Sequence, residues 1–128
     1  MTNWIIGQSD GFRAAVVEVT TPNRYSQWGT SDYEHGNGKC EFKGYPWASC
    51  ENARHYLERS PITCAEKQTP LLMIQAEEDH RCPLEQPEQL YTALMVLGRE
   101  VERVTVPGES RAFSRMGRPA TARSGWSG

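Results

Sequence analysis

The sequence predicts an α/β fold in which about three parallel strands are joined by crossover helices. Three observations predict it. Between Pro70 and Gly98 the chain places a short apolar run, an acidic turn and an amphipathic segment in that order, and this order indicates strand, turn and helix. A β-branched run precedes this stretch, and an alternating one follows it. Amphipathic segments separate the three runs, as the crossover connections of a parallel sheet require.

The amino-terminal part predicts a helix end and then a strand. Residues 2–6 are mostly apolar and Gly7 follows as a stop. A helix this short is not stable alone, so we expect its first turns to lie upstream of Met1. Residues 12–19 are rich in β-branched residues and lie between turn-forming sequences. They predict a second buried strand.

The middle of the chain predicts a loop and then a crossover helix. Residues 20–49 are rich in aromatic residues and glycine without a dominant period, which indicates a loop with one short helix near 25–28. Ser49 is a suitable N-cap for a helix that ends near Ser60, because Pro61 disfavours its continuation. This helix is the crossover between the first two strands.

The central stretch predicts a strand, an acidic turn and a helix. Residues 71–74 form a continuous apolar run, which suits a strand covered on both faces. Residues 76–79 place carboxylates past its carboxyl end, at the edge of an α/β sheet where ligand and catalytic groups collect. A helix follows, in which Pro87 can serve as the first residue and Gly98 suits the left-handed conformation at the end. The apolar residues at helical spacing are Leu84, Leu90, Tyr91, Leu94 and Leu97.

The carboxyl-terminal part predicts a third strand and then a tail. Residues 101–106 alternate between valine and polar residues, which indicates a less buried strand. Residues 111–128 are basic, rich in Gly, Ser and Arg, and nearly devoid of aliphatic residues, so they cannot form a closing amphipathic helix. We therefore expect one domain over 1–119 and a disordered tail over 120–128.

Composition narrows the range of partners. A chain of 128 residues suits one domain. Its net charge of -2 and pI near 5.9 give no electrostatic reason to expect nucleic acid or an anionic membrane as a partner. No run approaches the roughly 18 apolar residues of a membrane span, and Met1-Thr2-Asn3 is not a basic leader followed by a long apolar run, so we expect an unexported protein. We expect a cytoplasmic protein with small-molecule, peptide or protein partners.

The cysteine and histidine positions give little indication of a metal or redox site. The four cysteines form no CxxC pair, so free thiols are expected. A cluster of His35, Cys40, Cys50 and Cys64 has ligand types without a recognised spacing, so we predict neither a metal nor another cofactor. His55 lies at a surface-type position of the crossover helix. His80 adjoins Asp79, but neighbouring side chains on a turn rarely converge, so His80 is expected to be solvated.

Several spaced motifs resemble one family. The segment Thr69 to Leu97, with Gln75-Ala76-Glu77-Glu78-Asp79-His80-Arg81-Cys82-Pro83 at its centre, is similar to the last third of the catalytic domain of the prolyl oligopeptidase family of serine peptidases, especially its acylaminoacyl-peptidase-like branch. That family has Gly at position 76, often preceded by His, and its aspartate falls on Asp79. Flanking motifs agree in order and spacing: Ser60-Pro61-Ile62, Thr69-Pro70, Pro107-Gly108-Glu109-Ser110, Ser114-Arg115 and Gly117-Arg118-Pro119.

The resemblance implies an incomplete α/β-hydrolase fold over residues 1–119 and part of a catalytic triad. The triad of this fold follows the chain order Ser, Asp, His. By this resemblance Asp79 occupies the acid position, whereas the residue pattern alone favours a helix cap or a solvated turn residue. Residues 1–4 look like those directly after the nucleophile elbow, which would end one or two residues before Met1. Arg111 stands at the histidine position, where a guanidinium offers no lone pair and cannot act as a base.

Two functional hypotheses follow. In the first, the chain is the carboxyl-terminal part of a peptidase that hydrolyses peptide or acyl-peptide bonds without a cofactor, inactive as it stands, with Arg111 forming an ion pair with Asp79. In the second, it is a non-catalytic binding protein whose strand at 12–19 pairs through an exposed edge with a partner or a second copy. The aromatic residues of 20–49 would line a substrate pocket, as the resemblance implies, or simply cover the sheet.

Overall fold

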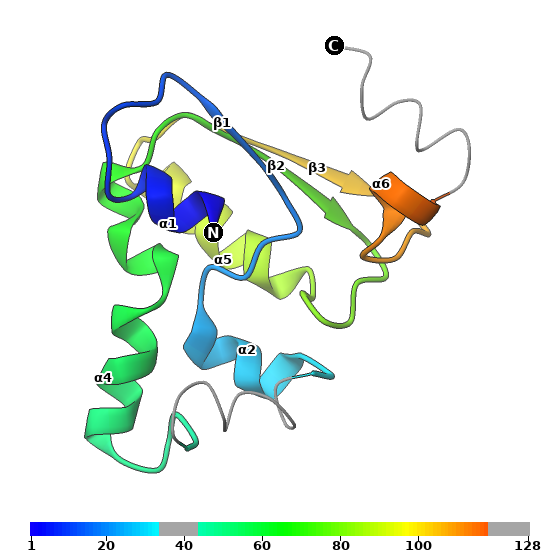
Figure 1. Cartoon of the computed structure of the whole chain (residues 1–128). Coiled ribbons are helices and arrows are strands. Elements are labelled where there is room, and N and C mark those ends of the chain that lie inside the picture. Colours follow the sequence, from blue (N-terminus) through cyan, green and yellow to red (C-terminus); the bar gives the residue numbers. More distant parts are fainter. Residues whose placement is uncertain (34–43, 118–128) are drawn as a thin grey trace.

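The sheet has three parallel strands, as the sequence predicts. The structure, a computed structural model, describes residues 1–33 and 44–117. Strands β1 (Ala15–Glu18), β2 (Leu71–Ala76) and β3 (Val101–Val106) lie in the order β1-β2-β3, all parallel. Figure 1 shows that α4 and the helical turns after it connect β1 to β2, and that α5 connects β2 to β3.

The helices largely follow the predicted order. They are α1 (Thr2–Ile6), α2 (Arg24–Thr30), α4 (Cys50–Glu58), the 3₁₀ helix η1 (Pro61–Lys67), α5 (Glu85–Val96) and α6 (Phe113–Met116). The helix at η1 was not predicted, nor was the single turn of α6, whose Phe113 is buried. The predicted disorder of 120–128 lies outside the described residues.

The predicted cap of α4 and the predicted end of α5 are confirmed, while the start of α5 lies earlier than predicted. The Ser49 hydroxyl accepts a hydrogen bond from the Asn52 amide at 3.0 Å, so Ser49 is the N-cap of α4. Gly98 has φ +66 after the last turn of α5, in the left-handed region that glycine tolerates best. Pro87 lies in the first turn of α5 rather than at its first residue, since the helix begins at Glu85.

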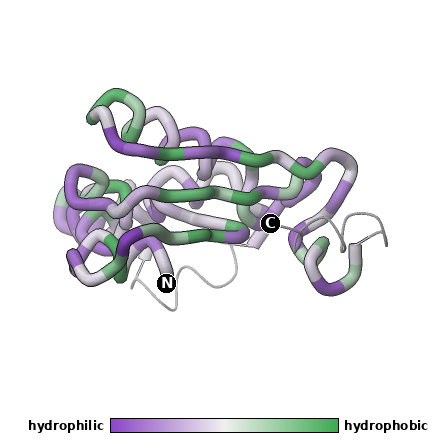
Figure 2. Tube along the Cα trace, turned by 90° about the horizontal axis from the view of Figure 1, so that it is seen from above, coloured by the Kyte–Doolittle hydropathy of each residue, from purple (hydrophilic) through white to green (hydrophobic). Residues whose placement is uncertain are grey.

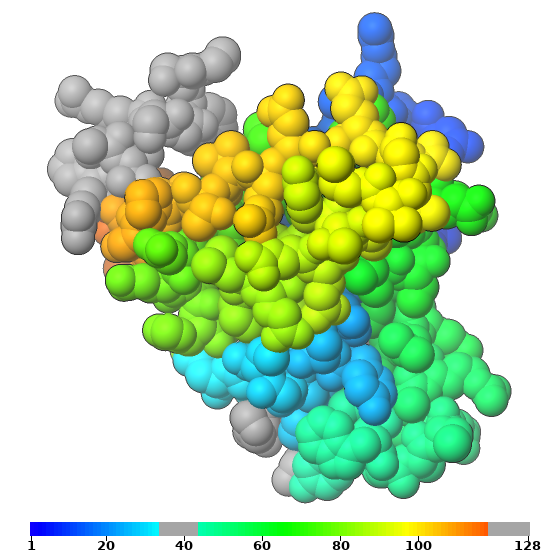
Figure 3. All heavy atoms as spheres, turned by 180° about the vertical axis from the view of Figure 1, so that it is seen from behind, coloured from blue at the N-terminus to red at the C-terminus, as the bar shows by residue number. Residues whose placement is uncertain are grey.

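The main core lies between one face of the sheet and helices α1, η1 and α5. Its side chains alternate along the strands, as they must when one face is covered. Burial of each large aliphatic side chain stabilises the fold by roughly 1.5–3 kcal/mol. The buried members are Ile6, Val17, Ala65, Leu71, Met73, Leu90 and Leu94. Seen from behind in Figure 3, α5 and β3 form much of the outer surface above α2.

The opposite face of the sheet is not covered by the described residues. Leu72 and Ile74 are only half-buried, and Val16 and Val104 are 59% and 48% exposed. The prediction that residues 71–74 are covered on both faces is therefore wrong for this part of the chain, because the described helices lie on one side. Figure 2 looks down on the open face, where the three strands run side by side with the helices behind them.

Strand β1 is shorter and less buried than predicted. It covers Ala15–Glu18 rather than 12–19, and Phe12 is 49% exposed. The strand has one neighbour, β2, and one covered face, so half of its side chains face solvent. Val19 follows it with φ +57, a conformation that a β-branched residue rarely adopts and that ends the extended run.

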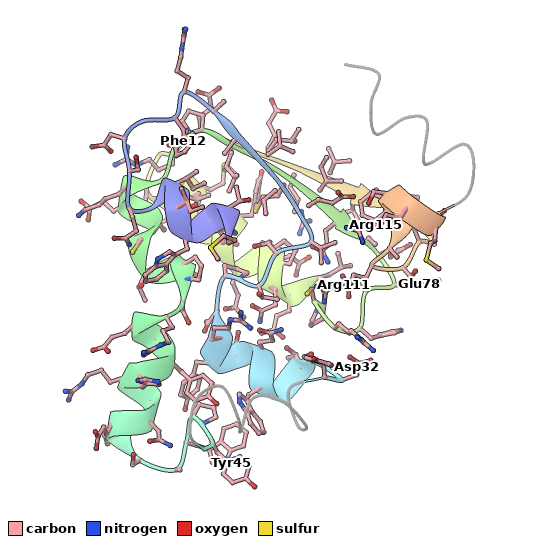
Figure 4. All side chains as sticks on the ribbon, in the orientation of Figure 1. Phe12, Asp32, Tyr45, Glu78, Arg111 and Arg115 are labelled. Atoms are coloured by element: carbon pink, nitrogen blue, oxygen red, sulfur yellow. The ribbon has the colours of Figure 1, made fainter. Side chains whose placement is uncertain are left out.

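Three aromatic residues of the middle region, Trp28, Tyr45 and Trp47, pack near α2 and α4 rather than on the sheet. Trp28 and Tyr56 form a separate core between α2 and α4, and the Trp28 indole N–H donates to the Tyr56 hydroxyl at 2.8 Å. Tyr45 and Trp47 stack on each other at 6.0 Å beside Trp28. Tyr45 lies at the far end of the molecule from the sheet in Figure 4.

Among the described residues, none of the helices combines the length and hydrophobicity needed to cross a membrane.

Candidate active site

Asp79 is buried at the carboxyl edge of the sheet, in the turn after β2. Asp79 is only 3% exposed to solvent. Oδ1 accepts hydrogen bonds from the backbone amides of Arg81 at 3.0 Å and Cys82 at 2.8 Å. Oδ2 accepts one from Gln75 Nε2 at 3.2 Å. Three donors therefore fix the orientation of this carboxylate, which is not a solvated turn residue.

Gln75 connects Asp79 to the rest of the sheet edge. The Gln75 side chain is fully buried, and its Nε2 also donates to the Cys82 carbonyl at 2.6 Å. Its Oε1 accepts from the Thr20 amide at 3.3 Å, and the Thr20 hydroxyl in turn accepts from Asn3 Nδ2. The sequence analysis missed this role, although Gln75 is the one polar residue in the apolar run 71–76.

Backbone hydrogen bonds attach the loop after β3 to the turn after β2. The amides of Glu77 and Glu78 donate to the carbonyls of Val106 and Glu109, both at 2.9 Å. In return the Gly108 amide donates to Glu77 Oε2 at 2.9 Å, and Gly108 turns the chain with φ +64. The Glu77 side chain is exposed, and its carboxylate accepts this hydrogen bond. In Figure 4, Arg111 and Glu78 lie at this same end of the sheet.

Arg111 and Asp79 both contact Cys82, but they do not form the predicted ion pair with each other. The guanidinium Nη1 donates to Cys82 Sγ at 3.3 Å, and no contact within 4.0 Å joins it to the Asp79 carboxylate in the described structure. The physical reason is twofold. Three donors already stabilise the Asp79 carboxylate, and removing an exposed cation from water to reach a buried carboxylate carries a desolvation penalty. Cys82 therefore links the two residues, through its amide to Asp79 and through its thiol to Arg111.

Among the described residues, the geometry can orient a hydrogen-bond donor but offers no base to accept a proton from a nucleophile. A carboxylate accepts about four hydrogen bonds, so three donors leave room for about one more on Oδ2 of Asp79. An imidazole N–H held there would be fixed in the tautomer that a general base needs. The guanidinium of Arg111 has only donors and stays protonated, so it cannot take a proton.

The histidines do not supply the missing base in the described structure. His80 is exposed, as predicted, and its backbone carbonyl accepts from the Asp32 amide at 3.1 Å. His55 Nδ1 lies 2.7 Å from Arg59 Nη1 on α4. His35 and Cys40 fall outside the described residues. Within 1–33 and 44–117, no three His, Cys, Asp or Glu side chains gather in an arrangement that could bind a metal.

A pocket of about 380 Å³ opens beside this edge, between α1 and the carboxyl end of β1. Asn3 and Thr20 line the pocket. A chain of hydrogen bonds runs from these two residues through Gln75 to Asp79. Arg24 and Arg59 also line the pocket, while Asp79 and Arg111 are not among its lining residues.

Comparison with known proteins agrees with this geometry and fixes the family. Residues 1–121 match the model of the prolyl oligopeptidase family. The chain therefore belongs to the prolyl oligopeptidase family, and its three parallel strands with their helices are part of an α/β-hydrolase-like domain. The predicted family and fold class are both confirmed.

Among the relatives, an uncharacterized peptidase of Bacillus subtilis, YuxL, is 39% identical over an alignment of 122 residues that covers 93% of this chain and 18% of the relative. The acylaminoacyl peptidase of Pyrococcus horikoshii matches with a TM-score of 0.86 and 30% identity over 94% of this chain and 19% of its own. An acylaminoacyl peptidase solved in complex with Z-Gly-Gly-Phe-chloromethyl ketone matches with a TM-score of 0.82 and 29% identity, over 94% of this chain and 19% of its own. The chain thus spans less than a fifth of the length of these relatives.

Proposed function

We propose that this chain supplies the acid arm of a serine peptidase site that hydrolyses peptide or acyl-peptide bonds. The observation that carries the proposal is the buried Asp79 carboxylate, fixed by three donors at the carboxyl edge of a parallel sheet. This is the edge at which α/β enzymes place catalytic groups. The turn that contains Asp79 is attached by hydrogen bonds to the loop leading to Arg111, the position of the family's histidine.

We propose further that residues 1–128 are catalytically inactive by themselves. The mechanism needs a serine nucleophile, a base to accept its proton and an acid to orient the base. The family's serine would precede Met1, and Arg111 is non-functional at the position of the base. Loss of the base alone lowers the rate by several orders of magnitude.

The expected substrate class comes from the relatives. One of them was solved with a peptide chloromethyl ketone, and the names of the acylaminoacyl peptidases indicate acylated peptides. A polypeptide that combines this chain with the missing nucleophile would act on the same class through an acyl-enzyme, without a metal or organic cofactor. The free thiols of Cys50, Cys64 and Cys82 support a reducing compartment such as the cytoplasm.

The test of this function is labelling with a serine-reactive fluorophosphonate. The folded chain is expected to remain unlabelled, while an intact acylaminoacyl peptidase treated in parallel is labelled stoichiometrically. A heat-unfolded sample of the chain controls for non-specific reaction. Stoichiometric labelling of the folded chain alone would show that it holds a working nucleophile and base, and the proposal would be wrong.

A second candidate function rests on the free edge of β1. The amides of Ala15 and Val19 donate to Pro70 and Ile74 of the neighbouring segment, so the backbone groups of Val16 and Glu18 point away from β2. Such an edge can pair with a partner strand or a second copy. Static light scattering distinguishes these outcomes. Pairing with a second copy doubles the measured mass, whereas a monomeric mass means that any partner of this edge is a different protein.

A further inference from the structure

The chain bends directly after β1, and the bend reverses a backbone amide. The Val19 amide donates to the Ile74 carbonyl at 3.0 Å, so it points towards β2. In an extended strand the next amide would point away from β2. Instead the Thr20 amide donates to Oε1 of Gln75, a side chain of β2, at 3.3 Å. The left-handed conformation of Val19, with φ +57, produces this reversal, and Figure 1 shows the chain turning back from the end of β1 towards α2.

The conformation of Val19 is strained and must be held by its surroundings. A β-branched residue at positive φ is an outlier, and such residues gather where a functional geometry depends on them. Two hydrogen bonds of the next residue hold the bend. The Thr20 amide donates to Gln75 Oε1, and the Thr20 hydroxyl accepts from Nδ2 of Asn3 in α1. Thr20, Asn3 and Gln75 are all buried, so water does not replace either bond.

The strain makes the two hydrogen bonds of Thr20 depend on each other. When one bond is removed, the other must hold Val19 at positive φ alone. Relaxation of Val19 to negative φ turns the Thr20 amide away from β2, so the second bond is lost with the first. Gln75 then loses the contact that fixes its oxygen and directs its NH₂ to Oδ2 of Asp79 and to the Cys82 carbonyl.

We propose, on the basis of the function proposed above, that Val19 and Thr20 are positioning residues that couple α1 to the Asp79 carboxylate through the Gln75 amide. In that function α1 lies directly after the family's nucleophile, and Asp79 is the acid. The turn around Asp79 fixes the carboxylate locally but makes no contact of its own with α1. The bend at Val19 supplies that connection, because Asn3 belongs to α1 and Gln75 to β2.

Hydrogen exchange of backbone amides, followed by NMR on the full chain, tests the coupling. Thr20→Val removes the hydroxyl that accepts from α1 and keeps the shape of the side chain. The Cys82 amide donates to Asp79, and its exchange rate is expected to rise about tenfold in this variant, the factor for the loss of one hydrogen bond. A purely global loss of stability would accelerate the core amide of Leu94 in α5 at least as much. The expected result is therefore a rise in the ratio of the Cys82 rate to the Leu94 rate.

The matched control is Thr21→Val. Thr21 is the next residue, is half-buried, and its hydroxyl forms no hydrogen bond within residues 1–33 and 44–117. This variant is expected to leave the ratio of the Cys82 rate to the Leu94 rate unchanged. Circular dichroism of each variant checks that the fold persists. Equal ratios in folded Thr20→Val and Thr21→Val would overturn the proposal.

Rescue by glycine is a sharper test, because glycine adopts positive φ without strain. When Val19→Gly is added to Thr20→Val, the remaining bond to Gln75 is enough to keep the bend. The Cys82 exchange rate is then expected to return to within about twofold of the wild type. A merely structural role of these residues predicts the opposite, since glycine raises the entropy of the unfolded chain and adds to the destabilisation. Further acceleration at Cys82 in the double variant would contradict the coupling.

The strain at Val19 is tested by comparing alanine and glycine at two positions of the same segment. Val16 is an ordinary strand residue, so Val16→Ala is expected to unfold at a higher temperature than Val16→Gly. At Val19 the order is expected to be reversed, because alanine keeps the Cβ that disfavours positive φ. The same order at both positions would show that Val19 is not held in the left-handed conformation, and the proposal would be wrong.

A proton signal separates this proposal from the proposed function. In Arg111→His, an imidazole bonded to Asp79 is expected to give a strongly downfield Nδ1 proton signal in NMR, and adding Thr20→Val is expected to move this signal upfield as the bond lengthens. If the signal is absent while the exchange ratios change as expected, the proposed function is contradicted and the coupling of α1 to Asp79 is supported. If the signal is present and neither it nor the ratios respond to Thr20→Val, the coupling alone is overturned.

Discussion

The Nε2 of Gln75 lies 3.2 Å from Oδ2 of Asp79, so the penultimate residue of β2 orients the carboxylate that follows the strand. The same amide donates to the Cys82 carbonyl and accepts from the Thr20 amide. One buried side chain thereby joins the ends of β1 and β2 and the turn after β2. The position of Asp79 depends on this amide as much as on the local turn.

Gln75→Leu is expected to destabilise the chain by about 3 kcal/mol or more. The substitution removes the hydrogen-bond partner of three buried groups, and each such loss costs roughly 1–3 kcal/mol. Urea denaturation followed by circular dichroism measures the change. Gln8→Leu is the control, because Gln8 is exposed and its side chain bonds only to the Cys64 thiol in the described structure. Equal stability of the two variants would contradict the role given to Gln75.

Asp79→Asn is expected to destabilise by about 1–3 kcal/mol although it keeps the shape of the side chain. The asparagine oxygen can still accept from the Arg81 and Cys82 amides, but its NH₂ then faces the NH₂ of Gln75. Turning the Gln75 amide over relieves that conflict only by pointing its NH₂ at the Thr20 N–H.

The matched control for Asp79→Asn is Asp32→Asn. Asp32 is exposed and forms a 4.0 Å ion pair with Arg81. Such an exposed pair contributes about 0–1 kcal/mol, so this variant is expected to stay close to the wild type in thermal unfolding. If Asp79→Asn proves as stable as Asp32→Asn, the donor network around Asp79 is not a structural constraint.

The sequence predicted those structural features that depend only on neighbouring residues. Ser49 as an N-cap and Gly98 at a left-handed position each depend on a few neighbouring residues, and both are confirmed. The parallel order of the strands also followed, because amphipathic segments lie between apolar runs. The ends of β1 could not be predicted from its own residues, since the length of an edge strand depends on which neighbours pair with it.

The candidate site was predicted in position but not in its contacts. Asp79 was located through the resemblance and the acidic turn. Its partner Gln75 and the contact of Arg111 with the Cys82 thiol depend on side-chain packing between segments 7 to 29 residues apart. The prediction that both faces of residues 71–74 are buried was wrong. An apolar run shows only that a strand can be buried on both faces, whereas actual burial depends on helices over the second face, and the described chain has none there.

Gly7→Ala is expected to destabilise by about 1–3 kcal/mol through overpacking. Gly7 has φ -83, so the backbone itself accepts alanine. The added Cβ would lie 2.8 Å from the Cys64 Cβ and 3.3 Å from the Asn3 carbonyl oxygen, which forces α1 and η1 apart.

The comparison for Gly7→Ala is Gly29→Ala in α2. No atom lies within 4 Å of a Cβ added at Gly29, and alanine lowers the entropy of the unfolded chain. The free energy of unfolding of the Gly29→Ala variant is expected to rise by about 0.4–1 kcal/mol. Thermal unfolding of both variants under identical conditions shows whether each substitution raises or lowers the stability of the chain. A stabilised Gly7→Ala variant would show that α1 and η1 are not in close contact.

Arg111→His is expected to place an imidazole in hydrogen-bond contact with Oδ2 of Asp79. The turn and the loop are already joined through Glu77 and Glu78, and Asp79 retains room for about one more donor. The carboxylate favours the imidazolium, so the pKa of the introduced imidazole should lie above its ordinary value of about 6.5. NMR titration of the ring protons measures it.

The pH dependence of the Arg111→His variant follows from the direction of the shift. Because the pKa of the introduced imidazole would be higher in the folded chain than in the unfolded chain, the added stability is fully present below about pH 6.5 and is lost as pH rises through the folded pKa. Adding Asp79→Asn should return the imidazole pKa to its ordinary range and remove this pH dependence. If the pKa is the same with and without Asp79→Asn, positions 79 and 111 do not form the acid and base pair of the family's triad, and the proposed role of this sheet edge is wrong.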